Sequence, residues 1–392
     1  MLKELRSVLG LSLGHFVIDI YSPVIPAVLP VLIATHGYSY FLAGLLVAAF
    51  NITSSLLQPT VGWLSDRKDV TVPFAVPFVL TSVCIGVFGF IGDYPVLLLC
   101  SACAAFGAAI FHPGALSAVN RLTKAENRGR LTSIFVIGGN FGFAVGPVFA
   151  AVAVGAFGLP GLIFLVIPGL LTAAFSRLIF PAPDGMERKA VVSAEVRGPI
   201  PIRPIAMVIG VGALRSWAIF ASIAFLPAYF HDHLGVDILM ANTLVSLTLL
   251  AGVVGQYVGG ALSDIFGRKE VTVLGLAAAI PPFALFLLTS GPVSYAALLV
   301  FGFFLWSTFS VTVAMAHEVM PGNVGFASGL MLGLAVGAGG IGVAVSGVLA
   351  DSFSLEAALS TLALPLIAAV VLAAAVPYPW KRFGRLIAGE TR

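Results

Sequence analysis

The sequence predicts an all-α integral membrane protein with twelve helices, and its composition and apolar runs carry that prediction. Of its 392 residues, 59% are hydrophobic and 9% are charged, whereas soluble domains are about 45–50% apolar and about 25% charged. A helix needs about 20 apolar residues to cross the hydrocarbon core of a bilayer. Such runs lie at roughly 8–34, 38–64, 71–92, 95–119, 131–154, 159–180, 205–230, 238–262, 271–290, 293–316, 324–349 and 355–378.

The stretch between the sixth and seventh runs differs from the rest of the chain. Residues 181–204 hold five prolines and six charged side chains before Arg203, a composition typical of a solvated linker. We therefore expect an N-terminal bundle of six helices at 1–180, a linker at 181–204, and a C-terminal bundle of six helices at 205–392.

The placement of basic residues predicts the orientation. If the N-terminus is cytoplasmic, nineteen of the twenty Lys and Arg residues fall on the cytoplasmic side, as the positive-inside rule requires. The opposite loops at 36–39, 92–95 and 231–237 contain none. An even number of spans places both termini on the same side, here the cytoplasm. We expect the protein to lie in the plasma (inner) membrane. The remaining basic residue, Arg215, is predicted to lie inside the membrane.

An internal repeat supports two related halves. Residues 58–67 and 256–265 recur at an offset of 198, and a weaker similarity links 129–146 with 325–342. The first pair aligns Gln58 with Gln256, Gly62 with Gly260, and Asp66 with Asp264. Repeated halves around a central site are typical of transporters in which the halves rock against each other.

The segment Gly260–Lys269 reads GALSDIFGRK and resembles the loop signature of the major facilitator superfamily, G-x-L-x-D-x-x-G-R-K. The first copy, beginning at Gly62, departs from it after Arg67. A small residue permits close helix approach, and a carboxylate near a helix N-terminus is stabilised there. We expect a conformational latch, against the alternative of charges that only set topology. Its residues would be Asp66, Arg67, Asp264 and Arg268.

Glycines recur at every fourth position in the fifth run. Gly138, Gly142 and Gly146 are followed by Pro147, a pattern that predicts close helix packing and a local break. The pattern resembles the G-x-x-x-G-P signature of the antiporter branch of the superfamily. That resemblance implies export.

Four ionisable residues are predicted to lie within the membrane: His15, Asp19, His112 and Arg215. His15 and Asp19 are four residues apart and share a helix face. An ionisable residue at this depth indicates function by default. The superfamily resemblance implies a cavity lined by the first, fourth, seventh and tenth helices, and these four residues fall on the first, fourth and seventh.

Two interpretations of these residues are compatible. In the structural one, Asp19 and Arg215 form an ion pair that holds the halves together, and the histidines are packing groups. In the functional one, Asp19 accepts a proton and His15 relays or tunes it. Arg215 is then a fixed positive charge for an anionic group on the substrate, which its fork of donors suits.

A closer resemblance covers nearly the whole chain. Segments at 12–19, 54–63, 110–113, 133–142 and 320–333 resemble the fosmidomycin-resistance branch of the superfamily. The resemblance implies a proton-driven efflux pump for small drug-like molecules. It maps the family's first-helix His and Asp onto His15 and Asp19, its His-Pro onto His112 and Pro113, and its Gly-Gly-Asn onto Gly138, Gly139 and Asn140.

The sequence thus favours a monomeric proton antiporter that exports a small, anionic or zwitterionic compound by alternating access. It would need no cofactor besides the proton gradient, and no metal, nucleic acid or enzymatic residue set is indicated. One alternative is a proton symporter or facilitator that imports sugars or organic acids. Another is a metal-ion carrier with ligands from His15, Asp19 and His112, which a nearby Arg215 would disfavour.

Overall fold

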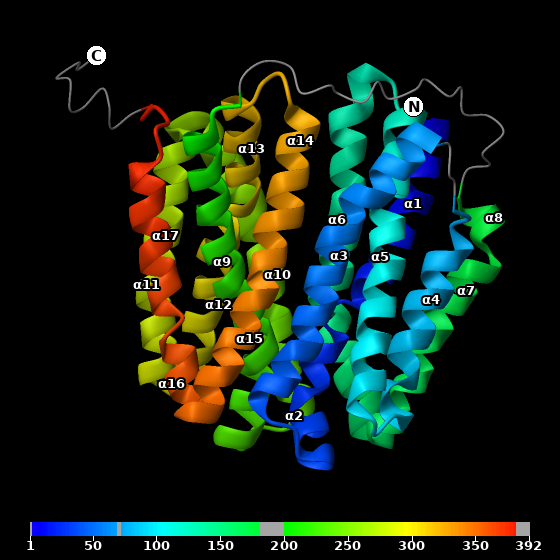
Figure 1. The fold of residues 1–392 in the computed structure, drawn as a ribbon, viewed down its shortest axis with the longest axis vertical. Coiled ribbons are helices and arrows are strands. Elements are labelled where there is room, and N and C mark those ends of the chain that lie inside the picture. The colour runs from blue at the N-terminus through cyan, green and yellow to red at the C-terminus, as the bar shows by residue number, and fades with distance from the viewer. Residues whose placement is uncertain (1, 69–71, 181–199, 382–392) are drawn as a thin grey trace. The chain divides into compact units, whose positions relative to one another are not determined.

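Helices form the structure wherever the chain is described. The computed structural model describes residues 2–68, 72–180 and 200–381, and in these ranges it contains helices and short connections but no strand (Figure 1). Ten helical segments of the described chain are long and apolar enough to span a membrane, and two shorter ones lie at Ala75–Phe90 and Leu159–Ala174. Together they coincide with the twelve predicted runs, which confirms the predicted fold.

The first of two compact units contains the described residues up to Phe180 together with Ile223–Ser246. The predicted linker lies largely outside the described residues, at 181–199. The helices of the N-terminal part are α1 (Leu2–Ile20), α2 (Val24–His36), α3 (Tyr40–Lys68), α4 (Ala75–Gly86), η1 (Val87–Phe90), α5 (Tyr94–Leu122), α6 (Ala125–Phe157), η2 (Leu159–Leu165), α7 (Val166–Ala174) and α8 (Ser176–Ile179).

The second unit contains the described residues up to Ser222 after the linker, and those from Leu247 onward. Two helices, α9 and α10, contribute to both units. The helices after the linker are α9 (Ile202–Ala228), η4 (Tyr229–His233), α10 (Ile238–Phe266), α11 (Arg268–Leu288), α12 (Pro292–Ser307), α13 (Phe309–Val319), α14 (Val324–Gly329), η5 (Leu330–Ala335), α15 (Val336–Ser352), α16 (Leu355–Ser360) and α17 (Ala363–Ala375).

The first span is interrupted just after Asp19. Helix α1 ends at Ile20 and α2 begins at Val24. Pro23 has no backbone N–H to donate to the carbonyl of Asp19, four residues back, and its ring would crowd that carbonyl. The Ser22 N–H donates to the Asp19 carbonyl instead, at 3.3 Å. The break thus places the Asp19 side chain in the last turn of α1.

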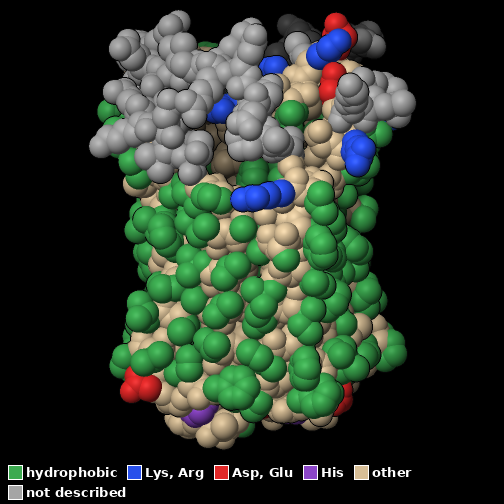
Figure 2. All heavy atoms as spheres, turned by 90° about the vertical axis from the view of Figure 1, so that its right-hand side faces the viewer, with side chains coloured by type: hydrophobic (Ala, Val, Ile, Leu, Met, Phe, Trp, Pro, Cys, Tyr) green, Lys and Arg blue, Asp and Glu red, His purple; other side chains and the backbone are tan. Residues whose placement is uncertain are grey.

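Apolar side chains cover the face of the molecule shown in Figure 2. Hydrophobic groups fill most of its middle, and the charged groups lie toward its two ends except for one basic side chain at the upper border of the apolar middle. Several large apolar side chains are strongly exposed, including Leu178 at 81% and Phe157 at 62%. An exposed apolar surface of this extent would be a liability in water, but it suits contact with lipid chains.

Candidate functional site

A carboxylate held between two histidines lies at the end of α1. His15 Nε2 is 3.1 Å from Asp19 Oδ2, and His112 Nε2 is 3.4 Å from Asp19 Oδ1. The Asp19 side chain is 15% exposed, and those of His15 and His112 are 11% and 24% exposed. The structure thus brings together three of the four ionisable residues predicted to lie within the membrane.

The neighbours of α1 explain how the cluster is assembled. Helix α1 packs against α5 and α6, and Figure 1 shows the three side by side. His15 and Asp19 follow each other on one face of α1, and His112 faces them from α5, which continues through Pro113. The three ligand-capable atoms lie within 4.8 Å of one another, so by distance alone they could also hold a metal ion.

The glycines of α6 set its distance from α1. A side chain at Gly138, Gly142 or Gly146 would collide with α1, since an added Cβ would lie only 2.3, 2.1 and 2.4 Å from the nearest atom there. Three glycines of α6, spaced four residues apart, therefore contact three residues of α1 with the same spacing. The pairs are Gly138 with Ser12, Gly142 with Phe16, and Gly146 with Ile20.

The structure differs from the prediction at Pro147. The pattern predicts a local break at Pro147, but α6 is a single helix through that residue. The missing hydrogen bond at a proline is tolerated in a membrane helix where neighbouring helices support it, and here α1 packs along the same stretch. Asn140, which the family resemblance singles out, lies on α6 and is half-buried.

The second unit holds Arg215, on α9, almost completely buried at 1% exposure. Its Nη1 donates to the Thr308 carbonyl at 3.1 Å and to the Thr312 hydroxyl at 2.7 Å. Its guanidinium lies over the Phe309 ring, 4.8 Å from the centroid, as in a cation–π contact. Its Nε is buried without a hydrogen-bond partner. Arg215 is therefore a buried cation whose hydrogen-bond partners are neutral and whose Nε–H is unpaired.

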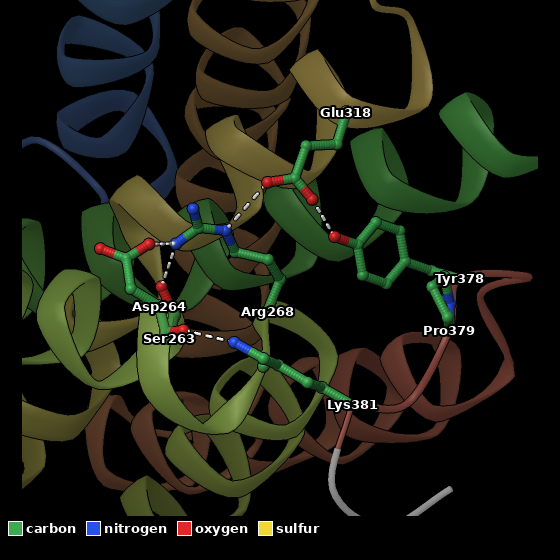
Figure 3. Close-up of a pocket in the computed structure, with 8 residues that line it drawn as sticks. Ser263, Asp264, Arg268, Glu318, Tyr378, Pro379 and Lys381 are labelled. Carbon is green, nitrogen blue, oxygen red and sulfur yellow. Dashed lines mark hydrogen bonds and ion pairs between the residues drawn. The ribbon is translucent and has the colours of Figure 1, made fainter.

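A second polar cluster surrounds Arg268, where the predicted latch lies. Arg268 Nη1 is 2.6 Å from Asp264 Oδ1 and donates to the Ser263 hydroxyl at 2.5 Å. Its Nε donates to Glu318 Oε1 at 3.2 Å. Figure 3 shows these side chains converging on Arg268. They line a pocket of about 310 Å³. Among the predicted latch residues, Asp264 and Arg268 thus form an ion pair.

The C-terminal segment completes this cluster. Tyr378 donates to Glu318 Oε2, and Lys381 Nζ donates to the Asp264 carbonyl at 2.5 Å (Figure 3). Lys269 donates to the Val376 carbonyl at 2.7 Å. The sequence alone does not indicate these residues as partners of the loop signature. Glu318, a lone acid at the end of an apolar run, was the one signal that could have indicated a site.

Backbone conformation and lack of space both explain why the signature has a glycine at position 267. Gly267 has φ +118°, a conformation that L side chains rarely adopt. An added Cβ would lie 2.1 Å from Glu270 Oε2 and 2.8 Å from Lys381 Cβ. In the first copy of the signature, the side chains of Asp66 and Arg67 lie outside the described part of the structure, and their backbone belongs to the last turn of α3.

Comparison with known proteins places these features in a family. The sequence pattern of the Major Facilitator Superfamily matches residues 11–331 and 208–386. The chain is 30% identical to the fosmidomycin resistance protein of Escherichia coli (strain K12), over 88% of this chain and 87% of that protein. It is 31% identical to the uncharacterized MFS-type transporter YfnC of Bacillus subtilis (strain 168), over 88% and 86% of the two chains.

A solved structure shares the fold. The crystal structure of a bacterial homolog of the human lysosomal transporter Spinster aligns over 95% of each chain, with a TM-score of 0.76 and 17% sequence identity.

Proposed function

Because the chain belongs to the Major Facilitator Superfamily, we propose that this membrane transporter is a proton-coupled antiporter that exports a small, drug-like compound. The cargo would be anionic or zwitterionic, and export would proceed by alternating access in the plasma (inner) membrane. The chain would act as a monomer, with both termini cytoplasmic and the proton gradient as its energy source.

The observation that carries the proposal is the carboxylate between two imidazoles. Histidine is the side chain whose ordinary pKa, about 6.5, lies in the physiological range. A carboxylate within 3.1 Å of one imidazole and 3.4 Å of another can pass a proton to either. The three side chains are mostly buried, so bulk water does not exchange freely with them. Such a cluster can hold a proton in one state and release it in another.

Arg215 would bind the anionic group of the cargo. It is permanently charged in a protein, so it suits a fixed binding role better than proton transfer. Its buried Nε has no partner, and a carboxylate or phosphonate oxygen would satisfy that donor. A charge-assisted bond of this kind contributes more than a neutral one.

Proton loss at Asp19 and cargo binding at Arg215 would alternate in a transport cycle. Proton release from Asp19 to the cytoplasm would favour binding of the cargo, and protonation from outside would favour its release. The Arg268 cluster would stabilise one end state, since rocking of the halves must separate or rearrange surfaces near the loop signature. Asp66 and Arg67 are the proposed latch residues of the first half.

The test uses purified protein in proteoliposomes under an imposed pH gradient of either sign. The antiporter should move a phosphonate cargo out of the vesicle when the outside is acidic, and inward when the gradient is reversed. A symporter would show the opposite dependence on the sign of the gradient. A metal-ion carrier, the second alternative, would instead transport divalent ions and leave phosphonates and cationic drugs unmoved.

A further inference from the structure

The imidazole of His15 is held on two sides by consecutive turns of α6. The Phe135 ring stacks on it with centroids 4.2 Å apart and an angle of 23°, and the Phe135 carbonyl oxygen is 2.9 Å from His15 Nδ1. One turn later, Gly139 leaves room for the ring, since an added Cβ would lie 2.3 Å from His15 Nε2. Helix α6 thus fixes both the position and the rotation of this ring.

The carbonyl determines where one proton resides. A carbonyl oxygen only accepts hydrogen bonds, so His15 Nδ1 must carry the hydrogen. In a neutral imidazole the other nitrogen, Nε2, is then an acceptor. An ionised carboxylate is also an acceptor. The 3.1 Å contact between Nε2 and Asp19 Oδ2 would oppose two lone pairs unless one proton lies between them.

Among the residues that the structure describes, two ionisable groups face His15. Asp19 faces it from α1, and His112 faces it from α5 with the ring centroids 5.2 Å apart. The remaining described ring neighbours, Phe111 and Phe135, are apolar. His112 can satisfy Asp19 Oδ1 as a neutral donor through Nε2. The two histidines thus have different tasks at the two oxygens of one carboxylate.

We propose that Phe135 and Gly139 are positioning residues that hold His15 as the Nδ1–H form, so that the exchanged proton moves only between His15 Nε2 and Asp19 Oδ2. This inference rests on the proposed proton coupling. When the proton is present, it bridges the two atoms. When it leaves, a neutral His15 and a carboxylate present opposed lone pairs, and their repulsion separates the two side chains or admits water.

The first test reads the protonated nitrogen directly. Nitrogen-15 NMR of full-length protein with labelled histidine, in lipid nanodiscs, distinguishes an N–H nitrogen from a bare one, and His15→Gln identifies the signals. We expect Nδ1 of His15 to keep its hydrogen across the pH range, while Nε2 responds to pH. A neutral Nε2–H form of His15 would overturn the inference. This measurement uses the native residue, so folding of a variant does not affect it.

The second test displaces the ring. Gly139→Ala should shift the midpoint of the pH profile for cargo flux by about one pH unit, a tenfold change in proton affinity, and should abolish the Nδ1–H signature. Phe135→Leu keeps the carbonyl and removes the stacking, so its shift should be smaller. The matched control is Gly155→Ala, on the same helix, where an added Cβ meets nothing within 4 Å.

The outcomes separate this inference from the proposed function. Coupled flux with an unchanged profile in Gly139→Ala overturns the positioning role and leaves the antiporter standing. An Nδ1–H signature in a protein whose flux ignores the pH gradient overturns proton coupling, while the ring geometry is confirmed.

Discussion

The two units bury their charges in different ways. In the first, Asp19 lies between two imidazoles, with Nε2 of His15 at 3.1 Å and Nε2 of His112 at 3.4 Å. In the second, Arg215 bonds to a carbonyl and a hydroxyl, lies over an aromatic ring, and keeps one donor unpaired. The first arrangement can change its charge at little cost, and the second cannot. This difference is the reason for proposing that the first unit carries the proton and that the second binds the anionic cargo.

The largest expected effect follows from removing the carboxylate. Asp19→Asn keeps the size of the side chain but cannot ionise, so pH-driven transport should fall by at least about 100-fold, the usual scale for loss of a proton-transfer group. Flux in proteoliposomes measures it. Asp232→Asn, at an exposed position, is the matched control, and size-exclusion elution checks the fold. Undiminished transport in Asp19→Asn would remove that residue from the mechanism.

A smaller effect is expected in the second unit. Arg215→Lys keeps the charge but loses the planar fork of donors, so the apparent affinity for an anionic cargo should weaken by about tenfold, which corresponds to one charge-assisted hydrogen bond. Concentration dependence of uptake measures it. Arg203→Lys, an exposed change near the start of the same helix, should have no effect. Equal affinities in the Arg215→Lys variant and the wild type would contradict direct contact with the anion.

The two histidines should differ in effect. His15 makes the shorter contact with Asp19 and is fixed by a backbone carbonyl, whereas His112 is farther from Asp19 and more exposed. His15→Gln should therefore slow coupled flux by about tenfold, and His112→Gln should slow it less. The same flux assay, repeated from pH 5 to 8, ranks the two variants. A larger loss in His112→Gln would reverse the roles.

The smallest effect is expected at the C-terminal segment. Burial, with the Glu318 carboxylate nearby, raises the pKa of the Tyr378 hydroxyl. The group therefore remains a donor at neutral pH, and its contribution should be lost only as pH rises beyond the ordinary tyrosine value of about 10. Tyr378→Phe should lower stability by about 1 kcal/mol or less. Thermal unfolding at pH 7 measures it, and a loss well above that size would mean that the cluster is a major structural support.

Much of the fold could be predicted from the sequence because membrane helices are specified by local apolar length. The cluster of Asp19 with its two histidines could be predicted in part for the same reason. His15 and Asp19 are four residues apart on one helix, so spacing alone places them together. The approach of His112 depends on how α5 packs against α1, which no local pattern encodes.

The partners of Arg215, and the distant partners of Arg268, lay beyond the reach of the sequence. Thr308 lies between α12 and α13, Thr312 lies within α13, and Tyr378 follows the last helix. These contacts join residues 50 or more positions apart. Polar residues of ordinary types at such separations carry no periodic signal. The continuity of α6 through Pro147 was also missed, because packing against α1 decides it and the proline itself does not.

Opposite movement of proton and cargo can be measured in vesicles that are loaded with a phosphonate and have equal pH inside and outside. An internal pH dye follows the lumen as the cargo leaves down its own gradient. If the protein is an antiporter, the lumen becomes more acidic, since each departing cargo molecule brings protons in, and Asp19→Asn abolishes the signal. A lumen that becomes more alkaline, or cargo efflux with no change in pH, would contradict antiport.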